Sequence, residues 1–263
     1  MQSRHLNRFQ YFREQANTSK NYYVSYIRHF FTLTADTRVL EIGCGEGGNL
    51  LPFAKLGCTV TGIDIDHERT EQAVLFFQQT GQDGRFLCHD FMTFPSPKKA
   101  DERFDIIIVH DVMEHIPPSE KQRFLMHIHC FLRQGGVVFV GFPAWQNPFG
   151  GHQQISVGFA SKLPYIHLYP NCVYRRLLYY SGATPEQIDE LLRIKQARLT
   201  IEKFERLAKM TGFTIADRIL WLINPHYQQK FHLSPRRLGM PWAALPYLRN
   251  YLTTSAFYIL KDQ

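Results

Sequence analysis

The chain has 263 residues and a formal net charge of +7, with 44% hydrophobic and 20% charged residues. These proportions exclude a disordered or fibrous protein, and the length is enough for one main domain with a buried core. No apolar run approaches the roughly 20 residues that cross a bilayer, and the polar N-terminus has no signal-peptide core, so we expect a cytoplasmic protein.

Neither the cysteines nor the basic residues point to a ligand. The five cysteines are widely spaced and form no CxxC pair, so we expect reduced thiols and no zinc site. A positive charge could attract nucleic acid, but the basic residues are scattered and no run of five occurs.

The predicted elements begin with a helical segment, residues 1–35. Aromatic residues three or four apart in this segment indicate an amphipathic helix that packs on another part of the protein. Strands and helices then alternate. Strands are predicted at residues 38–42, 59–63, 85–88, 104–110 and 136–142, and helices at 49–56, 67–79 and 119–132. Strands rich in Ile and Val, alternating with helices, are typical of a parallel sheet covered on both faces.

The alternation stops at Pro143. Residues 144–195 are rich in proline, glycine and aromatic residues, and we interpret them as a lid inserted after the fifth strand. A helix at 198–210 resumes the pattern, followed by strands at 214–223 and 255–260 that a proline-rich stretch connects.

The sequence therefore predicts an α/β fold. We expect a doubly wound, mostly parallel seven-stranded sheet with helices on both faces. Residues 36–263 form this main domain in the prediction, and the lid belongs to it.

The strongest motif, EIGCGEGGN at residues 41–49, lies between the first strand and the next helix. Glycines there let the backbone turn tightly and let a ligand approach. Gly43, Gly45 and Gly48 have the GxGxxG spacing of a dinucleotide site, and Asp64 follows about twenty residues later, where an acid would meet a ribose. The glycine spacing alone does not distinguish a nicotinamide dinucleotide site from a site for another cofactor.

Over roughly residues 36–142 the sequence resembles the class I S-adenosylmethionine-dependent methyltransferases. The shared pattern is E-x-G-x-G-x-G, then an acid that ends the second strand, then an acid after the third. The resemblance implies S-adenosylmethionine as the cofactor. It also implies the cofactor-binding residues, which are Glu41, Gly43, Cys44, Gly45, Gly47, Asp64, Ile65, Asp90, Phe91 and His110.

The resemblance also implies what most of these residues do. The loop 43–47 would hold the methionine portion with support from Glu41, Asp64 would bind the ribose hydroxyls, and Asp90 and Phe91 would lie at the adenine. This cofactor has no phosphates, so a loop beside an acid suits its ammonium and sulfonium charges. In contrast, we expect Asp66 to cap the following helix.

The fourth strand ends in HDVMEHIPP, where His110 would line the cofactor cleft. Asp111, Glu114 and His115 have the spacing of a divalent-ion site found in some relatives, the quinone-ring O-methyltransferases, except that Asp replaces the first Glu. A Glu-His pair is also common in members without metal, so we predict no metal here.

The lid offers aromatic and polar groups that suit a partly apolar acceptor with hydroxyls: Trp145, Asn147, Phe149, His152, Gln153, Tyr165 and His167. Methyl transfer to a hydroxyl needs positioning and a general base. His115 and His152 are the candidates for that base.

The predicted function is methyl transfer to a small-molecule or lipid or glycan-intermediate acceptor. A nucleic-acid methyltransferase is the second hypothesis, although the sequence has no Asn-Pro-Pro-Tyr-like tetrapeptide or RNA-binding appendage. A nicotinamide-dependent oxidoreductase would leave Glu41 and Asp90 unexplained, and a non-catalytic binding module remains a further alternative. The sequence leaves open the acceptor, its reacting atom and the oligomeric state.

Overall fold

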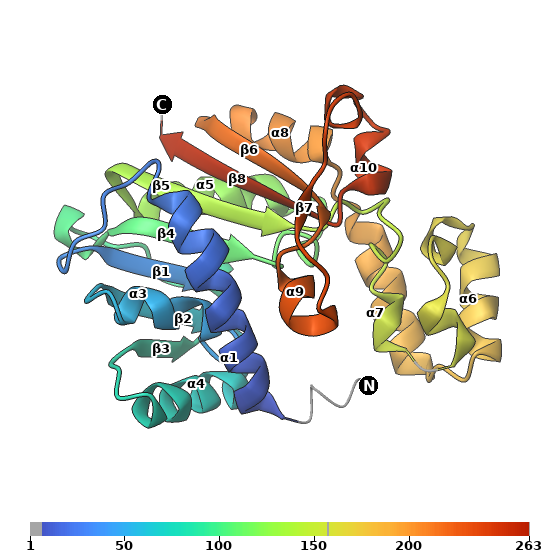
Figure 1. The fold of residues 1–263 in the computed structure, drawn as a ribbon, viewed down its shortest axis with the longest axis horizontal. Coiled ribbons are helices and arrows are strands. Elements are labelled where there is room, and N and C mark those ends of the chain that lie inside the picture. The colour runs from blue at the N-terminus through green and yellow to red at the C-terminus, as the bar shows by residue number, and fades with distance from the viewer. Residues whose placement is uncertain (1–6, 157, 263) are drawn as a thin grey trace.

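A computed structural model describes residues 7–156 and 158–262, and its centre is one mixed β-sheet (Figure 1). The sheet order is β3-β2-β1-β4-β5-β8-β6-β7. The strands are β1 Arg38–Ile42, β2 Thr59–Asp64, β3 Arg85–Cys88, β4 Phe104–His110, β5 Leu132–Phe142, β6 Phe213–Ile223, β7 Arg236–Arg237 and β8 Ser255–Asp262. Strands β1 to β5 pair in parallel, whereas β8 runs antiparallel to β5 and β6.

The predicted α/β class and mostly parallel sheet are confirmed, but the prediction of seven strands is wrong. The described part of the chain has eight, because β7 pairs antiparallel with β6 at the sheet edge. β7 has only two residues and lies in the proline-rich stretch. A strand this short has no alternation of polar and apolar residues by which to recognise it.

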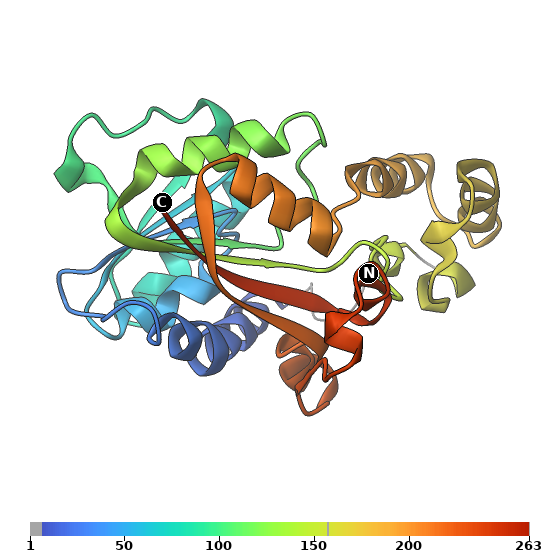
Figure 2. The same ribbon diagram turned by 90° about the horizontal axis from the view of Figure 1, so that it is seen from above.

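Helices cover both faces of the sheet (Figure 2). α5 Lys121–Phe131 and α8 Ile201–Met210 contribute Phe124 and Phe204 to the core on one face. On the other face lie α1 Arg8–Thr18, a π-helical turn Ser19–Tyr23, α2 Val24–Ile27, α3 Leu51–Ala54 and α4 His67–Gln79. No described helix is both long and apolar enough to cross a membrane.

The N-terminal helix packs on the glycine-rich loop. Arg8 donates to Glu46 at 2.7 Å, and a Cβ on Gly48 would lie 2.6 Å from the carbonyl oxygen of Phe12. Residues 8–27 are thus helical, as predicted, and they contact the loop after β1 directly. The prediction is wrong for residues 28–35, which form turns and coil before β1. Residues 1–6 of the predicted helical segment lie outside the described residues.

The N-terminal helices also meet the C-terminal part of the chain. α9 His226–Phe231 follows β6 and packs against α1. The hydroxyl of Thr18 lies 3.2 Å from Nδ1 of His226, and Tyr22 donates to Gln228 at 2.9 Å. Two segments about 200 residues apart in the sequence therefore form one wall.

The segment predicted as a lid folds around a small core of its own. It contains α6 Asn171–Tyr180 and α7 Pro185–Ala197, which ends two residues beyond the predicted boundary. Its apolar side chains form a separate cluster that includes Tyr174, Leu178 and Leu191. In both ribbon views α6 and α7 lie to one side of the sheet rather than over a face of it (Figures 1 and 2).

Candidate active site

The glycine-rich loop follows β1 at the carboxyl ends of the parallel strands. Gly43 and Gly45 have φ of +72° and +50°, which side chains rarely adopt. A Cβ on Gly43 would also lie 2.4 Å from Val112, whereas one on Gly45 would meet nothing closer than 4.0 Å. Gly45 therefore leaves open space beside its backbone, as a loop that receives a ligand requires.

Glu41 lies beneath this loop and is fully buried. Its Oε1 accepts a hydrogen bond from Asn49 at 2.7 Å, while Oε2 is buried without a partner. Burial, with a smaller contribution from the negative charge of Asp64, raises the pKa of Glu41 to about 8. A buried carboxylate oxygen without a donor is costly unless a ligand supplies one, so this atom fits a cationic group in the loop.

Asp64 ends β2 with its carboxylate fixed by two backbone amides. Oδ2 accepts from the amide of Gly45 at 2.7 Å, and Oδ1 accepts from that of Asp66 at 2.9 Å. A carboxylate has about four acceptor sites, so each oxygen still has capacity for a ligand hydroxyl. The next side chain, Ile65, is 75% exposed beside this carboxylate.

Asp90 follows β3 and accepts from the amide of Met92 at 2.9 Å, which caps a short 3₁₀ turn. The side chain of Phe91 is buried between α5 residues, with ring centroids 5.5 Å from Phe124 and 4.9 Å from Phe131. Any contact of Phe91 with a ligand would therefore come from its backbone. The same holds for Cys44, whose thiol is buried in the core.

Asp66 has the capping position that the sequence predicts. Its Oδ1 accepts from the amide of Arg69 at 3.2 Å, at the first turn of α4. It therefore serves as a matched structural comparison for its neighbour Asp64.

His110 ends β4 and is held by a tyrosine of the π-helical turn. Tyr23 Oη lies 2.8 Å from Nε2 of His110, and the rings are 4.9 Å apart. Nδ1 of His110 faces Oδ2 of Asp111 at 3.4 Å. Asp111 itself has φ of +54°, a strained value for an aspartate that turns the chain sharply after β4.

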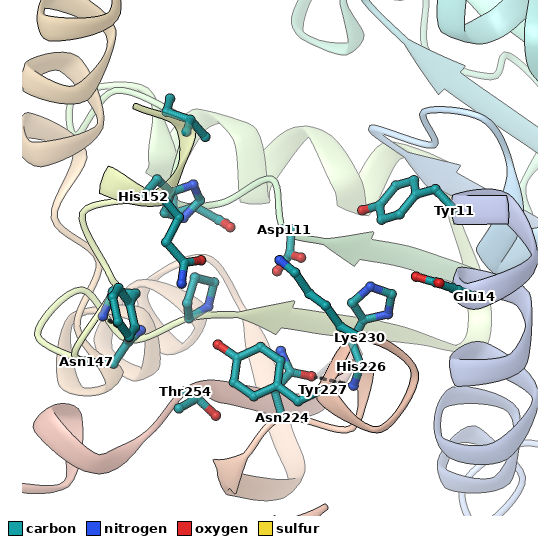
Figure 3. Close-up of a pocket in the computed structure, with 15 residues that line it drawn as sticks. Tyr11, Glu14, Asp111, Asn147, His152, Asn224, His226, Tyr227, Lys230 and Thr254 are labelled. Atoms are coloured by element: carbon teal, nitrogen blue, oxygen red, sulfur yellow. Dashed lines mark hydrogen bonds between the residues drawn. The ribbon is translucent and has the colours of Figure 1, made fainter. Parts of the chain in front are cut away.

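A pocket of about 200 Å³ opens beyond β4 (Figure 3). Its lining residues come from four parts of the chain: α1, the turn after β4, the start of the insertion and the segment between β6 and β8. They are Tyr11, Glu14, Asp111, Glu114, Pro143, Asn147, Phe149, His152, Gln154, Ile155, Asn224, His226, Tyr227, Lys230 and Thr254. Burial and the nearby carboxylates of Asp111 and Glu46 raise the pKa of Tyr11. Tyr11 is thus within electrostatic range of Glu46 in the glycine-rich loop.

Three of the seven insertion residues expected at an acceptor line this pocket, namely Asn147, Phe149 and His152. The other four, Trp145, Gln153, Tyr165 and His167, do not line it. The sequence did not predict that α1 and the segment after β6 also line this pocket. Neither carries a motif, and only the packing of α1 against α9 brings them to the pocket.

The two candidate bases, His115 and His152, lie together with ring centroids 5.3 Å apart, edge to face. Desolvation lowers the pKa of both rings, and that of His152 falls to about 4. Both imidazoles are therefore neutral at neutral pH and have a ring nitrogen that can accept a proton. His152 lines the pocket.

Glu114 is buried in the pocket wall, and neither carboxylate oxygen has a hydrogen-bond partner. Burial, assisted by the charge of Asp111, raises its pKa well above the usual value. Lys121 donates to the carbonyl oxygens of Met113 and Ile116 and so holds the turn that carries Glu114. Across residues 7–156 and 158–262, no three His, Cys, Asp or Glu side chains converge as a metal site would require.

Comparison with known proteins gives partial sequence matches. Residues 39–136 match the family described as "Methyltransferase domain". A ubiquinone biosynthesis O-methyltransferase from Brucella anthropi is 32% identical over 103 residues, which is 39% of this chain and 40% of the relative. The enzyme of the same name from Coxiella burnetii is 30% identical over 116 residues, 44% of this chain and 47% of the relative. The chain thus spans less than half the length of these relatives.

Solved structures match over most of the chain. Magnesium protoporphyrin IX methyltransferase from Synechocystis, with bound SAH, has 15% identity and a TM-score of 0.57, covering 95% of this chain and 84% of that one. A putative sarcosine dimethylglycine methyltransferase from Galdieria sulphuraria has 15% identity and a TM-score of 0.59, covering 93% and 85%. At these identities the likeness shows the fold alone. The predicted class I, Rossmann-like fold is confirmed by these structures, and the sequence match to the methyltransferase-domain family is confined to residues 39–136.

Proposed function

We propose that this chain, which carries a methyltransferase domain in residues 39–136, transfers a methyl group from S-adenosylmethionine to a small-molecule acceptor. The observation that carries the proposal is the buried Oε2 of Glu41, which has no partner and lies beneath the glycine-rich loop. A site for an uncharged or phosphorylated group would not use a desolvated carboxylate in this position, whereas a cofactor with an ammonium and a sulfonium would.

The residues after β1, β2 and β3 would hold the cofactor. Glu41 and the backbone of residues 43–47 would bind its methionine portion, and Asp64, oriented by the amide of Gly45, would bind the ribose hydroxyls. The exposed side chain of Ile65 would cover one face of the adenine, and Asp90 would lie at its edge. The bound cofactor supplies an electrophilic methyl group.

The pocket beyond β4 would bind the acceptor. Asp111, Asn147 and Tyr227 offer hydrogen-bonding groups, and Phe149 and Ile155 offer apolar surface, so the pocket suits a small molecule with both characters. The name that the relatives share supports a hydroxyl oxygen as the reacting atom. His152, neutral and at the pocket wall, would take the proton from that hydroxyl, with His115 beside it.

The insertion, residues 144–195, would act as a movable cover over this pocket. Asn147, Phe149 and His152 at its start line the pocket, while its helices have a separate core that could move as a unit. Closure would exclude water and align the acceptor with the methyl group. Hydrogen exchange tests this proposal. Protection in the free protein equal to that of the central strands, and unchanged by cofactor and acceptor, would exclude a movable cover.

Calorimetric titration of the purified chain tests the proposed function. We expect micromolar binding of S-adenosylmethionine and of its demethylated product, and no measurable binding of NAD. Binding of NAD without binding of S-adenosylmethionine would contradict the proposal. Incubation with radiolabelled cofactor and candidate hydroxylated small molecules then identifies the acceptor class, with nucleic acid as the comparison substrate.

A further inference from the structure

A loop between β7 and α10 Arg249–Leu252 exposes large apolar side chains to solvent. We call residues 240–248 the apolar loop. Met240 is 76% exposed, Trp242 52%, Tyr247 65% and Leu248 55%. Exposed apolar residues that are scattered singly are ordinary, but a cluster within one short loop marks a contact surface.

The chain segment that carries this loop has charges of one sign. The sequence has no Asp or Glu between Asp217 and Asp262, although Arg236 and Arg237 lie just before the loop and Lys230 further before it. Both arginines are exposed on β7. This segment is therefore cationic, while Glu202 of α8, the carboxylate that contacts the loop, is paired with Arg249. The electrostatic complement of the segment is an anionic surface.

The base of the apolar loop is fixed. Glu202 on α8 accepts hydrogen bonds from the amide of Tyr247 and from the side chains of Arg249 and Asn250, at distances of 2.7–2.9 Å. Arg249 is buried and so anchors the network in the protein, while the bond from the Tyr247 amide lies at the surface. The loop is thus held in place with its apolar side chains outward, and Figure 1 shows the connection between β7 and α10 projecting beyond the end of the sheet.

We propose that the apolar loop docks on the surface of an anionic lipid membrane. Trp and Tyr favour the interfacial region of a bilayer, where Met and Leu can insert among the acyl chains. Arg236 and Arg237 would lie at the level of the anionic headgroups, and each such residue strengthens the attraction. The surface suits a membrane better than a second copy of the chain, because a stable dimer uses roughly 20–30 residues a side.

This proposal does not depend on the proposed function. It rests on the exposure and the charge of the loop alone. However, the same segment between β6 and β8 supplies Asn224, Tyr227 and Thr254 to the pocket.

Co-sedimentation of the full chain with vesicles tests the proposal. We expect binding to vesicles of phosphatidylcholine with phosphatidylglycerol, little binding to phosphatidylcholine alone, and weaker binding in high salt. Of the three tryptophans, Trp242 is half exposed and Trp221 is buried, so binding should shift the Trp242 emission to shorter wavelength.

Two pairs of matched variants locate the surface. The double variant Met240→Ser with Trp242→Ser should weaken vesicle binding about tenfold or more. The control is Leu75→Ser with Met126→Ser, two exposed apolar residues on α4 and α5, which should bind normally. Arg236→Gln with Arg237→Gln should also weaken binding, whereas Arg206→Gln with Lys209→Gln on α8 changes the net charge equally and should not.

Thermal melting of each variant confirms that it is folded. Absence of binding to the anionic vesicles would overturn the proposal, as would equal binding by the loop variants and their controls. Sedimentation velocity tests the alternative, in which a second copy of the chain covers the loop. A concentration-dependent dimer that the Met240→Ser and Trp242→Ser changes abolish would assign the loop to a second copy of the chain.

Discussion

Tyr23 Oη lies 2.8 Å from Nε2 of His110, and the other ring nitrogen of that histidine faces the carboxylate of Asp111. Tyr23 is buried in a π-helical turn, whereas Asp111 lines the pocket. Irregular turns of this kind often occur at functional sites. The tyrosine is therefore a positioning residue, because it fixes the ring that orients a pocket carboxylate.

Replacement of Tyr23 by Phe should impair methyl transfer. The change removes one hydrogen bond and should lower the free energy of unfolding by about 0.5–1.5 kcal/mol. It should also lower kcat/KM, because His110 and Asp111 lose their fixed orientation. Tyr26→Phe is the matched control, since Tyr26 donates to Asp217 at 2.9 Å and neither residue lines the pocket. An equal effect of both variants on kcat/KM would show that Tyr23 is only structural.

Replacement of Asp64 by Ala should weaken cofactor binding by about 1–3 kcal/mol, because charge-assisted hydrogen bonds to the ribose are lost. Asp66→Ala is the comparison. It removes the cap of α4 and should lower the free energy of unfolding by about 1 kcal/mol with cofactor affinity unchanged. Calorimetric titration and thermal melting separate these effects. Normal cofactor affinity in Asp64→Ala, with a much lower Tm, would assign Asp64 a purely structural part.

Cofactor binding should release protons from Glu41. Its raised pKa of about 8 means that the carboxyl is mostly protonated in the free protein at neutral pH. A positive charge beside Oε2 favours the ionised form and lowers that pKa, so a proton leaves. Calorimetry at pH 7 in buffers of different ionisation enthalpy measures the release. Glu41→Gln has no proton to lose, and the same release in this variant would exclude Glu41 as the source.

Buried His167 should make stability depend on pH. Burial lowers its pKa to about 4, below the usual 6.5, so the unfolded chain binds the extra proton first. Stability is then fully present above about pH 6.5 and is lost as pH falls toward 4, by up to about 3 kcal/mol. Urea unfolding across this pH range should show a smaller loss of unfolding free energy for His167→Gln than for His29→Gln, a control at an exposed position. An equal dependence of unfolding free energy on pH in the two variants would contradict the prediction.

Several helices and strands could be predicted from the sequence because the residue pattern that determines each one lies within the element itself. The helix at 67–79, with Asp66 as its cap, and the strands at 85–88 and 104–110 agree with the structure at both ends. Each is bounded by a cap or a turn and has a clear apolar pattern. The glycine-rich loop was found for the same reason, since its residue types are set by backbone conformation.

The pocket was only partly predictable, because its walls come from segments without a local pattern. Tyr11 and Glu14 are ordinary residues of an amphipathic helix, and Tyr227 follows a proline after β6. Their proximity depends on the packing of α1 against α9, which no periodicity in the sequence encodes. The aromatic residues of the insertion were harder to interpret for a different reason. Their number suggested an acceptor surface, but some of them, such as Tyr174, pack in the insertion's own core.

The contact between α1 and α9 also bears on how the protein is synthesised. Thr18 leaves the ribosome early, whereas its partner His226 emerges only after β6. The glycine-rich loop and its covering helix are therefore complete while one wall of the pocket has yet to be translated. We expect a nascent chain stopped before α9 to expose the face of α1 that carries Thr18, together with Tyr22 in the following turn, and to be open to proteases there until translation ends.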